Sequence, residues 1–183
     1  MQIARRTFLR TSGGALVTAA AARFAPAFGA VAPGPRTLAL SNIHTGEKLK
    51  LDYWANGAYV PAALTEVNRV LRDYRTGDIH VIEPKLLDLL HTLSHNMETD
   101  TAFEVISGYR SPQTNALLHE RSSGVAAKSL HMQGMAIDIR LPGRTLPKLH
   151  DAALAMGWGG VGFYPTSDFV HVDVGRVRKW SGI

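Results

Sequence analysis

Apolar residues recur at two spacings along the chain, and each spacing predicts one type of element. Residues 36–54 are predicted to form a β-hairpin, because residues 48–53 alternate polar and apolar side chains and Thr45-Gly46 supplies a turn before them. Further short strands are predicted by apolar alternation or clustering. They cover residues 103–107, 137–140, 161–164 and 169–174.

Helix signals occur in four other segments. They cover residues 61–74, 84–97, 112–120 and 146–156. Pro61 and Pro112 suit a first helical turn, whose amide hydrogens have no partner within the helix, and Gly157 suits a helix end. Helices and strands follow one another without a regular βαβ rhythm. We therefore expect an α+β fold with an antiparallel sheet flanked by helices.

The composition is that of a folded domain. The chain has 183 residues, of which 45% are hydrophobic and 19% are charged, and this suits one domain with its own core. The formal net charge of +5 depends on the N-terminus, because residues 1–30 hold four arginines and no acid. Without them the chain has 16 basic and 15 acidic residues. A near-neutral domain without a basic stripe argues against nucleic acid as a partner.

Residues 1–30 have the features of an export signal. Arg5-Arg6-Thr7-Phe8-Leu9-Arg10 is similar to a twin-arginine motif, and an apolar stretch too short to span a bilayer follows at residues 15–22. Small residues then offer cleavage sites after Ala27 or Gly29. We expect export to the periplasm and a single mature domain at residues 31–183, with no stable membrane span; an uncleaved N-terminal anchor is the alternative. The chain has no cysteine, so it has neither disulfides nor thiolate metal ligands.

Imidazoles and carboxylates gather near the ends of two predicted strands. His131, Asp138 and His171 would give zinc three ligands and leave the fourth tetrahedral position to water. Seven positions separate the first two, so Gly134 is expected to bend the chain between them. Alternation then places Asp138 and His171 on strand faces that point away from the core. Ordinary polar residues on strands are the alternative interpretation.

Other candidate motifs are weaker. His91 and His95 are four residues apart on a predicted helix, but Thr92 occupies the glutamate position of a His-Glu-x-x-His zinc motif. The glycine-rich residues 157–162 neither follow a strand nor open a helix. We interpret them as a helix end and a place of close backbone approach, rather than as a phosphate site. The tryptophans are interpreted as packing residues: Trp54, Trp158 and Trp180.

One pair of motifs resembles a known family. Ser-x-His-x-x-Gly-x-Ala-x-Asp at residues 129–138, followed by Asp-x-x-His at residues 168–171, resembles the zinc D-Ala-D-Ala carboxypeptidase and murein endopeptidase family, most closely its murein endopeptidase K-like members. Residues 107–112 and 160–165 add to the resemblance, which covers about residues 35–181. It implies a fold of the Hedgehog/D,D-peptidase type.

The resemblance also implies roles for individual residues. The ligands of one zinc ion would be His131, Asp138 and His171. Asp168 would be the general base, although many relatives have the longer glutamate there. Asp173 is the alternative base, and we interpret it instead as a hydrogen-bond partner of a zinc ligand. Arg110 matches an arginine that contacts the substrate carbonyl or carboxylate, and Ser129 matches a serine that helps to hold the substrate.

The expected reaction is zinc-dependent hydrolysis of peptide cross-links in bacterial peptidoglycan, whose stem peptides would be the binding partner. Zinc lowers the pKa of its bound water and polarises the scissile carbonyl, while a carboxylate takes the proton of the water. Cross-links also carry free carboxylates, which suit an arginine in the cleft. A catalytically silent, zinc-containing wall-binding module is the alternative, and the presence of Arg110 and Asp168 favours the enzyme.

Overall fold

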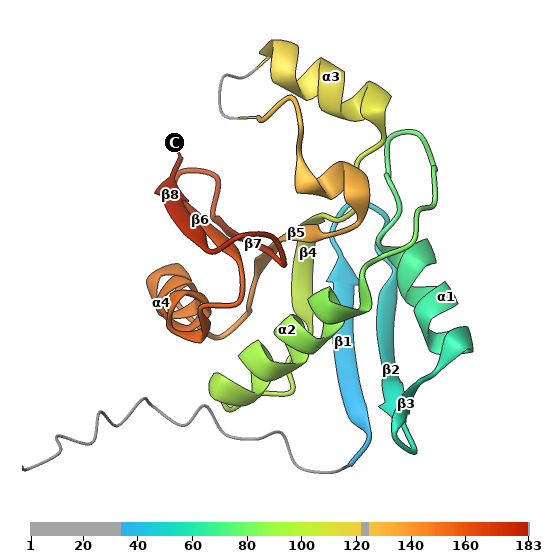
Figure 1. The fold of residues 1–183 in the computed structure, drawn as a ribbon. Helices are drawn as coiled ribbons and strands as arrows, with labels where there is room; N and C mark the ends of the chain where they lie inside the picture. The colour runs from blue at the N-terminus through green and yellow to red at the C-terminus, as the bar shows by residue number, and fades with distance from the viewer. Residues whose placement is uncertain (1–33, 122–124, 183) are drawn as a thin grey trace, which may run out of the picture. The chain divides into compact units, whose positions relative to one another are not determined.

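The structure, a computed structural model, describes residues 34–121 and 125–182 (Figure 1). The predicted export signal lies outside these residues. The described strands form one sheet in the order β3-β2-β1-β4-β5-β7-β6-β8. The strands are β1 Arg36–Asn42, β2 Lys48–Ala55, β3 Ala58–Tyr59, β4 Phe103–Ser107, β5 Ala136–Arg140, β6 Gly160–Tyr164, β7 Phe169–Asp173 and β8 Arg178–Ser181. The helices are α1 Pro61–Val70, α2 Pro84–Asn96, α3 Pro112–Arg121, the 3-10 helix η1 Leu130–Gln133 and α4 Leu146–Met156.

The α+β class is confirmed, but the prediction of an antiparallel sheet is wrong, because the sheet is mixed. β1 pairs with β4 in parallel, and β6 pairs with β8 in parallel. Connectivity explains both pairs. The chain passes through α1 and α2 between β2 and β4, which lets β4 run in the direction of β1. β7 runs antiparallel to β6. The chain then reverses once more, and β8 pairs with the other edge of β6, so β8 runs in the same direction as β6.

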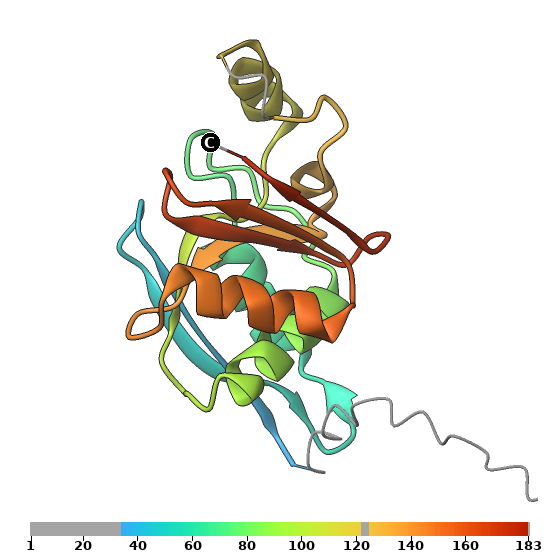
Figure 2. The ribbon, with the colours of Figure 1, turned by 90° about the vertical axis from the view of Figure 1, so that its left-hand side faces the viewer.

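Three helices share one hydrophobic core with the sheet. Buried residues of α1, α2 and α4 form a single cluster with alternate residues of the strands, and Figure 2 shows α2 and α4 side by side. The isoleucines on either side of Asp138 and the valines on either side of His171 belong to this cluster and are at most 1% exposed. Because successive strand residues point to opposite faces, Asp138 and His171 lie on the face away from these helices.

Most predicted boundaries agree with the structure to within one residue, and the end of α1 differs by more. Gly157 ends α4 with a φ of 64°, as expected. α1 ends at Val70 rather than Tyr74, because the next residues bind another segment: the Leu71 carbonyl accepts a hydrogen bond from the Tyr109 amide at 2.8 Å. No helix in the part of the chain that the structure describes is both long enough and apolar enough to cross a bilayer.

Candidate metal centre and cavity

His131 lies on η1, a single turn between a serine and a glycine. The Ser129 hydroxyl accepts a hydrogen bond from the His131 amide at 3.3 Å, as an N-cap residue does. Gly134 ends the turn with a φ of 66°, which glycine adopts without strain. A Cβ atom at Gly134 would also collide with the carbonyl oxygen of Val81. The predicted bend is therefore confirmed, and it brings His131 to β5.

Asp138 and His171 lie opposite each other on β5 and β7, where the register pairs them directly. Oδ1 of Asp138 is 3.2 Å from Nε2 of His131 and 2.9 Å from Nδ1 of His171. The two nitrogens are 3.2 Å apart. All three side chains are buried, and within residues 34–121 and 125–182 they are the one group of three or more His, Asp or Glu residues that could hold a metal ion.

Nε2 of His131, Oδ1 of Asp138 and Nδ1 of His171 form a triangle of possible donor atoms. The size and chemistry of this triangle suit zinc. Tetrahedral ligands at about 2.0–2.1 Å from zinc lie about 3.3 Å from one another, which is close to the separations of the three donor atoms. Two imidazoles and one carboxylate are also donors that catalytic zinc sites use. The structure thus brings together the three residues that the sequence suggested as ligands.

Hydrogen bonds to neighbouring groups fix which nitrogen of each histidine faces the triangle. Nδ1 of His131 lies 2.7 Å from the Gly108 carbonyl, which can only accept, so this nitrogen carries the proton. Nε2 of His171 lies 3.0 Å from Oδ2 of Asp173. A proton on that nitrogen leaves Nδ1 of His171 with a free lone pair. Metal-binding histidines are commonly oriented by such partners.

The charges of the group favour a cation. Burial lowers the pKa of His131, so this imidazole is held in the neutral form that binds metals. Burial opposes ionisation of Asp138, but the imidazoles of His131 and His171 outweigh it and hold the pKa of the carboxyl well below its ordinary value. Burial also disfavours charge on His171, yet its bonds to Asp138 and Asp173 outweigh burial and raise its pKa. A cation and a proton therefore compete for Nδ1 of His171.

Arg110 lines the cavity beside this group, but its guanidinium is already engaged. Nη2 donates to Oδ2 of Asp138 at 2.6 Å, and Nε donates to the Ser107 hydroxyl at 3.0 Å. The side chain is 12% exposed. Arg110 thus holds one oxygen of Asp138, which leaves Oδ1 for an ion. Its predicted contact with substrate would use the remaining N–H groups.

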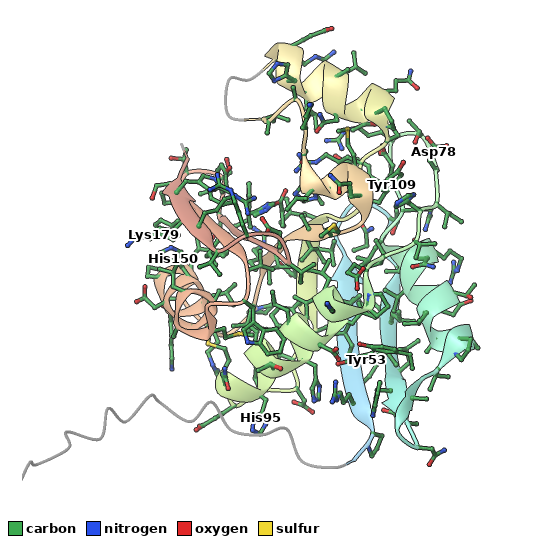
Figure 3. All side chains as sticks on the ribbon, in the orientation of Figure 1. Tyr53, Asp78, His95, Tyr109, His150 and Lys179 are labelled. Carbon is green, nitrogen blue, oxygen red and sulfur yellow. The ribbon has the colours of Figure 1, made fainter. Side chains whose placement is uncertain are left out.

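A buried carboxylate that the sequence reasoning missed supports the turn that carries Arg110. Oδ2 of Asp73 accepts hydrogen bonds from the amide and the hydroxyl of Ser111, at 2.9 and 2.8 Å. On the other side of the turn, the Arg110 amide donates to the His131 carbonyl at 3.2 Å. Next to it, Tyr109 stacks on His80, with ring centroids 4.7 Å apart; Figure 3 labels Tyr109 at this junction. The turn is therefore fixed between the segment after α1 and η1.

A cavity of ≈ 540 Å³ opens at the triangle. Segment 125–131 contributes one part of its lining, and β6, β7 and β8 contribute another. Its lining includes the three clustered donors and both residues suggested to bind substrate, Arg110 and Ser129. A peptide chain could therefore reach the donors from solvent.

Trp180, which the sequence analysis interpreted as a packing residue, packs over β6 and also lines this cavity. The register aligns Asp138, His171, Gly162 and Trp180 in one row across β5, β7, β6 and β8. The indole lies over Gly162, where a Cβ atom would come within 2.6 Å of the ring, and its centroid is 5.1 Å from that of His171. Its Nε1 donates to the Tyr164 hydroxyl at 2.8 Å. The close backbone approach predicted for the glycine-rich segment is confirmed here.

Asp168 and Asp173, the two aspartates considered as bases, differ in burial and in the number of hydrogen bonds they accept. Asp168 precedes β7 in a left-handed conformation with a φ of 53°, and its side chain is 61% exposed and 2.9 Å from Arg140. It is absent from the cavity lining among the described residues. Asp173 is fully buried and accepts five hydrogen bonds, one of them from His171. The other donors are the amides of Gly160 and Gly175 and two nitrogens of Arg178.

His91 does not join a metal group in the described structure. Its Nδ1 is 3.0 Å from the Thr37 carbonyl, and the one candidate metal group among the described residues excludes it.

Comparisons with known proteins agree with the geometry. Residues 30–180 match the family model described as Peptidoglycan L,D-endopeptidase MepK. The chain is 44% identical over 177 residues to the proteins of that name from Escherichia coli strain K12 and Shigella flexneri, with 96% of each chain covered. It is 42% identical over 152 residues to the probable peptidoglycan L,D-endopeptidase MepK of Haemophilus influenzae, with 82% of each chain covered. The chain therefore belongs to the MepK family of metallopeptidases, as the motifs indicated.

Proposed function

We propose that this chain is an exported, zinc-dependent murein endopeptidase that hydrolyses peptide cross-links of bacterial peptidoglycan. The observation that carries the proposal is the triangle of His131 Nε2, Asp138 Oδ1 and His171 Nδ1, whose three residues all line one cavity. The names of the relatives, which describe peptidoglycan L,D-endopeptidases, support the substrate.

Those three atoms would hold one zinc ion, with a fourth position left to water. Bound zinc would lower the pKa of that water and polarise the scissile carbonyl. The Ser129 hydroxyl accepts from the His131 amide, so its own proton is available to a substrate carbonyl. The N–H groups of Arg110 that do not bind Asp138 or Ser107 would stabilise negative charge on the substrate.

Asp168 is the proposed general base. To act, its carboxylate must leave Arg140 and turn toward the cavity. Exposed ion pairs contribute only about 0–1 kcal/mol, so the departure costs little. Asp173 is a poorer candidate, because five donors occupy its oxygens and hold it on His171. We therefore retain Asp168 as the base and Asp173 as the partner that orients His171.

The wider proposal concerns fold type and location. Residues 31–183 would form a single zinc peptidase domain of the Hedgehog/D,D-peptidase type, and residues 1–30 a twin-arginine signal that directs it to the periplasm. Arg5-Arg6 and the short apolar stretch support this route. Replacing both arginines by lysine should leave the precursor in the cytoplasm, and undiminished export of that variant would contradict the route.

Digestion of purified sacculi by the zinc-loaded protein tests the activity. Mass analysis should show cross-linked dimers converted to monomers, and the masses identify the bond that is cut. The second candidate is the silent wall-binding module, which the exposed position of Asp168 favours. Sacculi that bind the zinc-loaded protein but release no monomers would support that module instead.

A further inference from the structure

The described residues that line the cavity carry an excess of positive charge. Among them, the cations are Arg110, Lys128 and Arg178, and the one side-chain carboxylate is that of Asp138. A divalent cation held by the donor triangle would add to this excess. Clefts lined by one sign of charge concentrate ligands of the opposite sign, so the cavity is suited to an anionic ligand.

Two of the three cations already bind carboxylates. Arg110 donates to Asp138 at 2.6 Å. Arg178 donates to Asp173 at 2.7 and 3.1 Å, and its guanidinium lies 4.9 Å from the centre of the Trp180 ring. Arg110 is therefore held by the proposed ligand Asp138, and Arg178 by Asp173, the hydrogen-bond partner of His171. The charges of the two guanidiniums are largely balanced by these two carboxylates.

Lys128 is different. It is exposed, and it forms no ion pair or hydrogen bond with any residue that the structure describes. Its backbone is nevertheless anchored on both sides. The Asn115 amide group donates to the carbonyls of Ala126 and Ala127 at 3.1 and 3.3 Å, and Ser129 caps η1 immediately after it. The backbone of Lys128 is therefore held at the edge of the cavity, while its ammonium group remains available to a ligand.

We propose that Lys128 binds a free carboxylate of the stem peptide next to the scissile bond, and that it selects such cross-links over those in which this carboxylate is amidated. The inference rests on the proposed function, which supplies a peptide as the ligand. An ammonium group attracts a carboxylate and gains no such charge interaction with an amide. The ammonium group of Lys128 therefore discriminates between the free acid and the amide form of the substrate.

Two cross-linked stem-peptide dimers that differ only in amidation of these carboxylates test the proposal on the zinc-loaded full chain. The wild type should favour the free acid by about two- to fivefold in kcat/KM, the scale of an exposed ion pair. Lys128→Met should bring this preference close to one, mainly by raising KM for the free acid. Lys128→Arg should keep the preference. Zinc content should be unchanged in both.

Lys179→Met is the matched control. Lys179 pairs in register with Val161, whose side chain lies in the core shared with α4, so it faces away from the cavity. Figure 3 labels it at the side of α4, near His150. This variant should keep the wild-type preference. A Lys128→Met enzyme that still prefers the free acid, or a wild type that cleaves both dimers equally, would overturn the proposal.

Calorimetric binding of the same dimers separates this inference from the proposed activity. If the wild type cleaves neither dimer, the peptidase proposal fails. A preference for binding the free acid that is lost in Lys128→Met would then still support the role of Lys128. Equal binding of the two dimers by wild type would contradict it.

Discussion

Nε2 of His171 lies 3.0 Å from Oδ2 of Asp173, and this contact determines that Nδ1 of His171 faces Asp138 and His131. Asp173 is held in turn by Arg178 at 2.7 Å. The proposed zinc ligand is thus oriented by a buried carboxylate on the same strand face, two residues further along β7.

Asp173→Asn should therefore weaken zinc binding. The substitution keeps the size of the side chain but removes the charge that orients His171, and such partners typically affect metal affinity by about 10–100-fold. The measurement is the zinc dissociation constant in competition with a chelator. Arg178→Gln is the control, because it leaves the contact between Asp173 and His171 in place and should have a smaller effect. Wild-type affinity in Asp173→Asn would show that this contact does not position the ligand.

Asp168→Asn tests the proposed base. Turnover should fall by about 100-fold or more, the usual scale for losing general acid–base help, while zinc content stays the same. Glu104→Gln is the matched control, since Glu104 also accepts a hydrogen bond from Arg140, at 2.6 Å, without an assigned role in proton transfer. Equal losses in both variants would mean that release of Arg140, rather than loss of a base, slows the reaction.

Gly162→Ala should destabilise the protein by forcing the Trp180 indole to move. The added Cβ would lie 2.6 Å from the ring, and overpacking of this kind typically costs about 1–3 kcal/mol. In a Trp180→Leu background, Gly162→Ala should lower the free energy of unfolding by less. Denaturant unfolding of the two single variants and the double variant should give a coupling free energy of about 1 kcal/mol between the two sites. Additive effects of the two substitutions would show that the indole does not occupy this position in solution.

Asp73→Asn should lower the free energy of unfolding at neutral pH by about 1–3 kcal/mol, since it weakens buried hydrogen bonds to Ser111. Burial opposes ionisation of Asp73, but bonds from Thr114, Ser111 and Arg75 outweigh it and lower the pKa of the carboxyl below 3.8. A depressed folded pKa gives stability that is present above the unfolded pKa and is lost as pH falls through the folded value. The difference between wild type and variant should therefore shrink below about pH 4. A difference that stays constant down to pH 2 would contradict this role.

Local patterns in the sequence predicted much of the site. Alternation placed Asp138 and His171 on the face away from the core, because the apolar residues beside them must be buried. Gly134 indicated the bend that brings in His131, because its left-handed backbone favours glycine. The same local rules gave most helix and strand boundaries.

Features that depend on distant pairing were not predicted. β8 has no apolar alternation of its own, and its parallel pairing with β6 is what places Trp180 in the row of His171. Asp73 contacts Ser111 across 38 positions, and no local motif signals that bond. The pairing of Asp168 with Arg140 likewise depends on how β5 and β7 meet.

Diffraction recorded at the zinc absorption edge from crystals of the zinc-loaded protein tests the central claim most directly. The proposed site predicts one anomalous peak bounded by Nε2 of His131, Oδ1 of Asp138 and Nδ1 of His171, at about 2.0–2.2 Å from each. Single alanine substitutions of these residues should each abolish the peak. A zinc ion bound elsewhere, one coordinated through Nε2 of His171, or a full peak that survives any of the three substitutions would contradict the site.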